Sequence, residues 1–188
     1  MPDWREILSR DGPGVWRTTY RLLANRADAD ECFQEVLVDA LELSRRREIR
    51  NWGGLLQRLA TVRSIDRLRQ RRRSRIREAV KGRETLSLHA PPASQAAEDA
   101  ELPERLRAAL ASIPVKQAQV FCLYALEEWN YQEIAVEMAI SVNAVGVLLH
   151  RARKRLQKQL MDKSEVPDPS SNGLKGRSVP PIARKELP

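Results

Sequence analysis

Arginine is the residue type most densely clustered in this sequence, and its characteristic chemistry is the binding of anions. Eight arginines lie between residues 63 and 77, with a single carboxylate, Asp66, among them. A guanidinium group stays charged at physiological pH and donates hydrogen bonds to phosphate and carboxylate oxygens. The cluster continues an amphipathic helical pattern that begins at Asn51, so we predict that a helix displays it. Nucleic acid is the first candidate partner, and an anionic membrane surface is the second.

A second basic group follows two apolar helical patterns between residues 130 and 158. Asn130 and Ser141 are typical N-caps, and Glu133 completes a capping box with Asn130. The connector between the two expected helices is about three or four residues long, which is typical of a helix-turn-helix. In that motif the second helix enters the DNA major groove. The second helix ends in His150, Arg151, Arg153, Lys154, Arg155 and Lys158, which suit phosphate contacts. The alternative is a helical hairpin with a solvated basic face.

A helix expected to start at Asp28 has an acidic face, although the protein as a whole is basic. Asp28 and Glu31 have the spacing of a capping box, and an apolar stripe follows from Phe33 to Leu41. The opposite face carries Asp30, Glu31, Gln34, Glu35, Asp39 and Glu42. Such a face is either an ordinary solvated surface or a docking surface for a basic partner.

Composition argues against several classes of function. The 188 residues carry a net charge of +8, which indicates a polyanionic partner. Cys32 and Cys122 lie in apolar patterns without metal-ligand spacing, so buried thiols are predicted, with no metal and no cofactor. Glu133 and Glu137 alone do not make a catalytic site, so we do not expect an enzyme or a small-molecule substrate. No signal peptide or membrane span is evident, and a cytoplasmic protein is expected.

The periodicity predicts an all-α protein with two small helical domains joined by a flexible linker. The first domain is expected over 1–78, and Gly12-Pro13-Gly14 is expected to break its first helix. The linker is expected over 79–101, and the domain with the helix-turn-helix over 102–162. The remainder, 163–188, is rich in proline and serine and is predicted to be a disordered tail.

Three stretches together resemble an extracytoplasmic-function (ECF) sigma factor of bacterial RNA polymerase. They read RADADECFQEVLVDAL, LLQRLATVRSIDRLRQRRR and IPVKQAQVFCLYALEEWNYQEIAVEMAISVNAVGVLLHRARKRL. The resemblance covers about residues 5–75, as sigma region 2, and 102–160, as sigma region 4. It implies binding to core RNA polymerase and to promoter DNA, and it allows for an anti-sigma factor as a further partner.

The resemblance also implies roles for individual residues. The acidic helix would dock on a coiled coil of the largest polymerase subunit through Glu31, Gln34 and Glu35. The arginine-rich helix would contact the −10 promoter element through Arg63, Asp66, Arg67, Arg69, Arg71, Arg72 and Arg73. The helix-turn-helix would read the −35 element through Ser141, Asn143, Ala144, His150, Arg151, Arg153 and Lys154.

The start of the expected recognition helix departs from the family pattern. The family usually shows Thr-Val-Lys-Ser-Arg, whereas this chain has Ala144-Val145-Gly146-Val147-Leu148. Four polar or basic positions are therefore small or apolar, and the remaining polar residues or DNA shape must contribute more to recognition. The alternative function is a free-standing helix-turn-helix regulator, which would leave residues 28–75 without a role.

Overall fold

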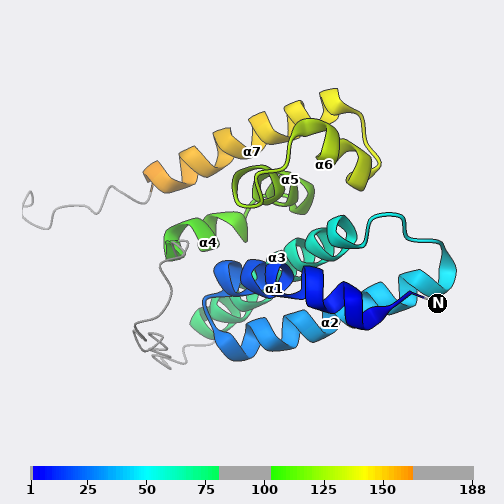
Figure 1. Ribbon diagram of the computed structural model, residues 1–188. Coiled ribbons are helices and arrows are strands. Elements are labelled where there is room, and N and C mark those ends of the chain that lie inside the picture. Colours follow the sequence, from blue (N-terminus) through cyan, green and yellow to red (C-terminus); the bar gives the residue numbers. More distant parts are fainter. Residues whose placement is uncertain (1, 81–102, 163–188) are drawn as a thin grey trace, which may run out of the picture.

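The computed structural model describes residues 2–80 and 103–162, and all regular structure in these ranges is helical. The prediction of an all-α protein is confirmed. The described residues form α1 (Trp4–Leu23), α2 (Arg26–Arg46), α3 (Trp52–Val80), α4 (Glu104–Leu110), α5 (Val115–Ala125), α6 (Tyr131–Met138) and α7 (Val142–Asp162) (Figure 1).

The first three helices pack on one another around a small apolar core. Val15 of α1, Val36 and Ala40 of α2, and Leu56 and Ala60 of α3 are buried together. The N-terminus of α3 forms as predicted, because the Asn51 side chain accepts a hydrogen bond from the Gly54 N–H at 3.0 Å. α3 is 29 residues long and carries the arginine cluster from Arg63 onward.

The last four helices contain the predicted helix-turn-helix, α6 and α7. Asn130 and Glu133 form the expected capping box at the start of α6. The Ser141 Oγ accepts from the Ala144 N–H at 3.2 Å and so caps α7. Ile134 of α6 and Val145 and Leu149 of α7 are buried against Val120 and Leu123 of α5. The core therefore fixes which face of α7 is left exposed.

The two groups of helices also share a core with each other. Leu22 and Ile65 from the first group are buried in one cluster with Leu110, Ile113 and Ala118 from the second. α5 packs against both α3 and α7, so α7 lies on the side away from α1–α3 (Figure 1). We call this packing the docked arrangement. The division into domains at 1–78 and 102–162 stays a prediction, and most of the expected linker, together with the expected tail at 163–188, lies outside the described residues.

Two local expectations were wrong. Gly12-Pro13-Gly14 does not break α1, which runs continuously from Trp4 to Leu23. Proline removes one backbone donor, but Ile7 and Val15 on either side are both buried, and this packing holds the helix together. α2 begins at Arg26 rather than at Asp28, because Asn25 is the N-cap and accepts from the Asp28 N–H.

Both cysteines are buried, as predicted, and burial raises the pKa of each thiol. The described residues contain no group of three or more His, Cys, Asp or Glu side chains placed to hold a metal ion. Taken singly, none of the described helices is long and apolar enough to span a membrane, and α6 with α7 passes only as a pair bent by 104°.

Candidate nucleic-acid interface

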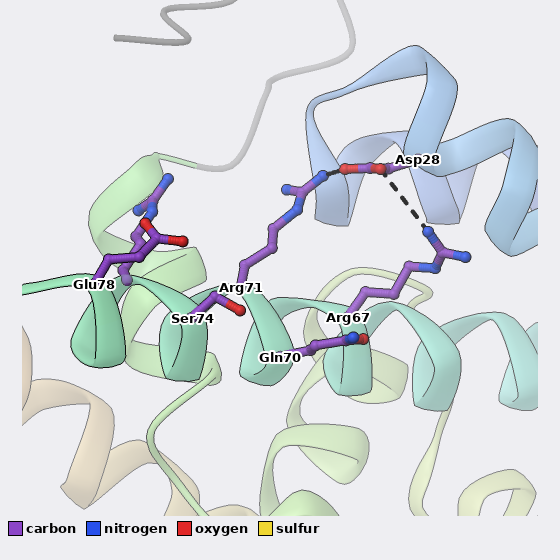
Figure 2. A pocket seen from close by; sticks show the side chains of 7 residues that line it. Asp28, Arg67, Gln70, Arg71, Ser74 and Glu78 are labelled. Carbon is purple, nitrogen blue, oxygen red and sulfur yellow. Dashed lines mark ion pairs between the residues drawn. The ribbon is translucent and has the colours of Figure 1, made fainter. Parts of the chain in front are cut away.

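Arginines of α3 and carboxylates of α2 form a row of ion pairs along the two helices. Arg63 makes two hydrogen bonds to Asp39, at 2.5 and 2.7 Å. One turn later, Arg67 contacts Glu31 at 2.9 Å and Glu35 at 2.8 Å. At the far end Arg71 pairs with Asp28, which also lies 3.8 Å from Arg67 (Figure 2). We call this set the α2–α3 ion-pair row.

Hydrogen bonds within the ion-pair row shift the pKa of three of its members, Glu31, Arg63 and Arg67, in favour of their charged forms. The hydrogen bond from Arg67 lowers the pKa of Glu31, and the hydrogen bonds that Arg67 and Arg63 donate to carboxylates raise the pKa of both arginines. A carboxylate whose pKa is lowered by folding stabilises the fold above its unfolded-state pKa, and this contribution is lost as the pH falls through the folded-state value. The two predicted polymerase-docking carboxylates, Glu31 and Glu35, are thus both partners of one predicted −10 arginine, Arg67.

Some of the other residues predicted to contact the −10 element donate hydrogen bonds within the fold, and the rest are exposed. Arg69 donates to the Ile113 carbonyl at 2.8 Å, across the docked arrangement, and Arg71 also donates to the Leu23 carbonyl at 3.0 Å. By contrast, Asp66, Arg72 and Arg73 are exposed. Arg72 and Arg73 are therefore the predicted residues best placed to meet phosphate groups without giving up a contact within the fold.

The residues predicted to read the −35 element lie along α7 or at its start. Ser141 and Asn143 are exposed at the beginning of the helix, and Ala144 is half-buried. Arg153 lies over the ring of Tyr124, 5.1 Å from its centroid, so it also holds α7 on α5. Within the described part of the chain no hydrogen bond or ion pair engages the side chains of three exposed residues, His150, Arg151 and Lys154.

The sequence did not predict a polar cluster that joins the two groups of helices in the docked arrangement. Glu127, which follows α5, accepts from the Thr18 hydroxyl at 2.8 Å and from the Gln57 amide. Burial is the main cause that raises the pKa of Glu127 above its ordinary value. Thr18, Gln57 and Glu127 come from three separate stretches of the sequence, so no local pattern could have brought them together.

Further polar contacts surround this cluster. Arg21 donates to the Leu126 carbonyl at 2.7 Å, and Arg58 pairs with Glu137 at 3.1 Å. Arg107 pairs with Glu104 at 3.5 Å, but its Nε and Nη2 atoms are buried without a hydrogen-bond partner among the residues that the structure describes. A buried charge with incomplete partners costs free energy. The docked arrangement thus combines a shared apolar core with charged groups that would gain hydration on separation.

The raised pKa of Glu127 predicts a specific pH dependence. The folded state binds this proton more tightly than the unfolded state, so the contribution of Glu127 to the free energy of unfolding decreases as the pH rises through the window above its ordinary pKa. Glu127→Gln removes the charge at every pH. The difference in stability between Glu127→Gln and the unsubstituted protein should therefore grow in favour of the variant from about pH 4 to about pH 7. Thermal unfolding across this range measures it, and a constant difference would contradict the assignment.

Comparisons with known proteins cover both groups of helices. A family model described as "Sigma-70, region 4" matches residues 103–156. The chain is 28% identical over 160 residues to the ECF RNA polymerase sigma factor SigE of Mycolicibacterium smegmatis, covering 85% of this chain and 62% of that protein. It is 29% identical over 165 residues to the ECF RNA polymerase sigma factor SigW of Bacillus subtilis, covering 79% and 83% of the two chains.

A solved structure has a similar fold. The sigma factor RpoE from Bartonella quintana, crystallised in complex with the anti-sigma factor NepR, matches with a TM-score of 0.52 and 20% sequence identity. The match covers 86% of this chain and 98% of that one. At this level of identity the match shows a shared fold, and it extends over helices from both groups.

Proposed function

We propose that the chain is a member of the ECF family of RNA polymerase sigma factors, and that it binds core RNA polymerase and directs it to promoters. The observation that carries this proposal is the extent of the similarity to SigW, which takes in 79% of this chain and 83% of that protein. The role is not enzymatic, and its place of action is the cytoplasm, where the polymerase works. An anti-sigma factor is a further candidate partner, since the RpoE structure was captured with one.

The exposed face of α2 supports polymerase docking. Glu31 and Gln34 are exposed and Glu35 is half-buried. Val38, one turn beyond Gln34, is 56% exposed, and Leu41 is 37% exposed. A face that combines carboxylates with exposed aliphatic side chains is typical of a protein-binding surface rather than of a solvated helix.

Promoter recognition at two places requires the docked arrangement to open. Positions −10 and −35 differ by about 25 base pairs, which is about 85 Å of duplex at 3.4 Å each. α5 packs against both α3 and α7, so the axes of α3 and α7 lie about 20 Å apart, at two helix-packing distances. The two helices therefore cannot reach both elements while they are docked, and binding to polymerase supplies the free energy that separates them.

The Glu127 cluster predicts how opening can be made easier. The double variant Thr18→Val with Gln57→Leu removes both side-chain donors to Glu127 and leaves its carboxylate half-buried without them. Such a loss costs about 1–3 kcal/mol, so the docked arrangement should be weakened by about fivefold or more. Small-angle X-ray scattering should show a larger radius of gyration than for the unsubstituted chain. An unchanged radius, with unchanged hydrogen exchange in α3 and α5, would contradict this role for the cluster.

A direct test of the proposed function compares DNA binding with and without core polymerase. The chain bound to core should select promoter fragments from a genomic library, and core alone should not. The exposed face of α7 favours one alternative, a free-standing regulator that binds duplex DNA without polymerase. Tight sequence-specific binding by the free chain, together with no binding to core, would support that alternative and refute the proposal.

A further inference from the structure

Val147 lies in the middle of the exposed face of α7, where its side chain does not contribute to the packed core. The buried side of this helix is formed by Val145, Leu149, Ala152 and Leu156. At 100° per residue, position 147 points almost directly away from that side. Val147 is 41% exposed. A β-branched residue has a lower helix propensity than alanine. An exposed valine at this position therefore destabilises the helix slightly, and no buried packing compensates for it.

The neighbours of Val147 on that face are polar or basic. Asn143 lies one turn before it, and His150 and Lys154 lie one and two turns after it, all exposed. Arg151 is exposed at the edge of the same face. This pattern of charge complements a polyanion, and it places a single aliphatic side chain among groups suited to phosphates and base edges. The occupant of the face is therefore duplex DNA rather than another protein.

Duplex DNA offers few apolar groups to a helix in the major groove. Among the base edges, the C5-methyl group of thymine is the apolar one, and proteins recognise it by contact with small aliphatic side chains. Asn143 supplies the complementary chemistry, since an asparagine amide can bond both N6 and N7 of adenine. The spacing of one helical turn between positions 143 and 147 suits the reading of neighbouring base pairs.

We propose that Val147 is a specificity-determining residue that contacts the methyl group of a thymine in the −35 element, beside an adenine read by Asn143. This inference rests on the proposed function. It goes further by naming a base, thymine, that the recognition helix prefers. It also gives a role to the sequence departure at 144–148, where the family usually has polar or basic residues. An aliphatic contact replaces one of the missing polar contacts.

Deoxyuridine differs from thymidine only by the missing methyl group, and it gives a sharp test. The full chain bound to core polymerase is first used to select promoter duplexes from a library randomised over the −35 element. Each selected thymine is then replaced singly by deoxyuridine, and the affinity is measured. At one position the replacement should weaken binding about three- to fivefold, as expected for one buried methyl group.

The variant Val147→Ala links that effect to the residue. It should weaken binding to the thymine duplex by a similar factor and should be insensitive to deoxyuridine at the same position. Met161→Ala is the matched control, because Met161 is 61% exposed near the other end of the same helix. This control should respond to deoxyuridine as the unsubstituted protein does.

Three results would overturn the inference. The first is selection of a −35 element without thymine, and the second is equal affinity for thymine and deoxyuridine at every position. The third is an equal deoxyuridine effect in Val147→Ala. In all three cases promoter selection itself succeeds, so the proposed function survives. If core and chain together select no promoter, the proposed function fails and the inference fails with it.

Discussion

Replacing Glu31 and Glu35 together by lysine is expected to abolish binding to core RNA polymerase and leave the helical fold intact. Both carboxylates lie on α2 toward the solvent, at 65% and 42% side-chain exposure, and their reversal would set like charges against a basic partner. Like-charge contact across an interface costs several kcal/mol, which corresponds to at least a hundredfold loss of affinity. Fluorescence anisotropy with labelled protein and core polymerase measures this loss.

The fold should survive that double substitution, because both glutamate side chains reach the solvent, where the lysines that replace them can extend away from Arg67. Arg67 would lose two partners but keep Asp28 nearby, and α2 would remain fixed by Val36 and Ala40. The matched control is Glu6→Lys with Glu48→Lys, which makes the same change in net charge at exposed sites off that face. Normal polymerase affinity in the test variant, or equal loss in the control, would remove α2 as the docking surface.

Replacing Arg72 and Arg73 together by glutamine is expected to weaken promoter binding and reduce its dependence on salt. Both side chains are exposed, whereas Arg63, Arg67, Arg69 and Arg71 already bond groups within the fold. Each lost phosphate contact removes about 0.9 from the slope of log affinity against log salt concentration. The slope should therefore become shallower by about 2 when both contacts are lost.

The control for this prediction is Arg45→Gln with Arg46→Gln. These two arginines are exposed at the end of α2, and their replacement changes the net charge by the same amount. A titration of promoter affinity between low and moderate salt, with polymerase present, compares the two variants. If both variants share one slope, the loss comes from overall charge, and α3 does not meet the phosphates through Arg72 and Arg73.

The features that could be predicted from sequence are those determined within one or two turns of a helix. Asn130 with Glu133, and Ser141, act as caps because the bonds of a helix start join residues two or three positions apart. Prediction failed where a second influence outweighed the local signal, at the start of α2 and at Pro13 in α1. Asn25 rather than Asp28 caps α2, and buried neighbours on both sides keep α1 helical through Pro13.

The contacts between distant segments could be predicted only in part. The four-residue spacing of Arg63, Arg67 and Arg71 matches that of carboxylates on α2, and two antiparallel helices with these patterns can pair along their length. The Thr18–Gln57–Glu127 cluster had no such signal, because it depends on how α1, α3 and the end of α5 meet. The individual polymerase and DNA contacts stay predictions, since the described chain carries no partner.

Transcription from a defined promoter tests the central claim most directly. Core RNA polymerase lacking any sigma factor is combined with the purified chain and a promoter fragment selected by the complex, and run-off RNA is measured. The account predicts RNA of one defined length that appears only when both proteins are present and is lost with the Glu31→Lys, Glu35→Lys variant. It would be contradicted by the absence of specific RNA from a chain that is folded and bound to its selected DNA.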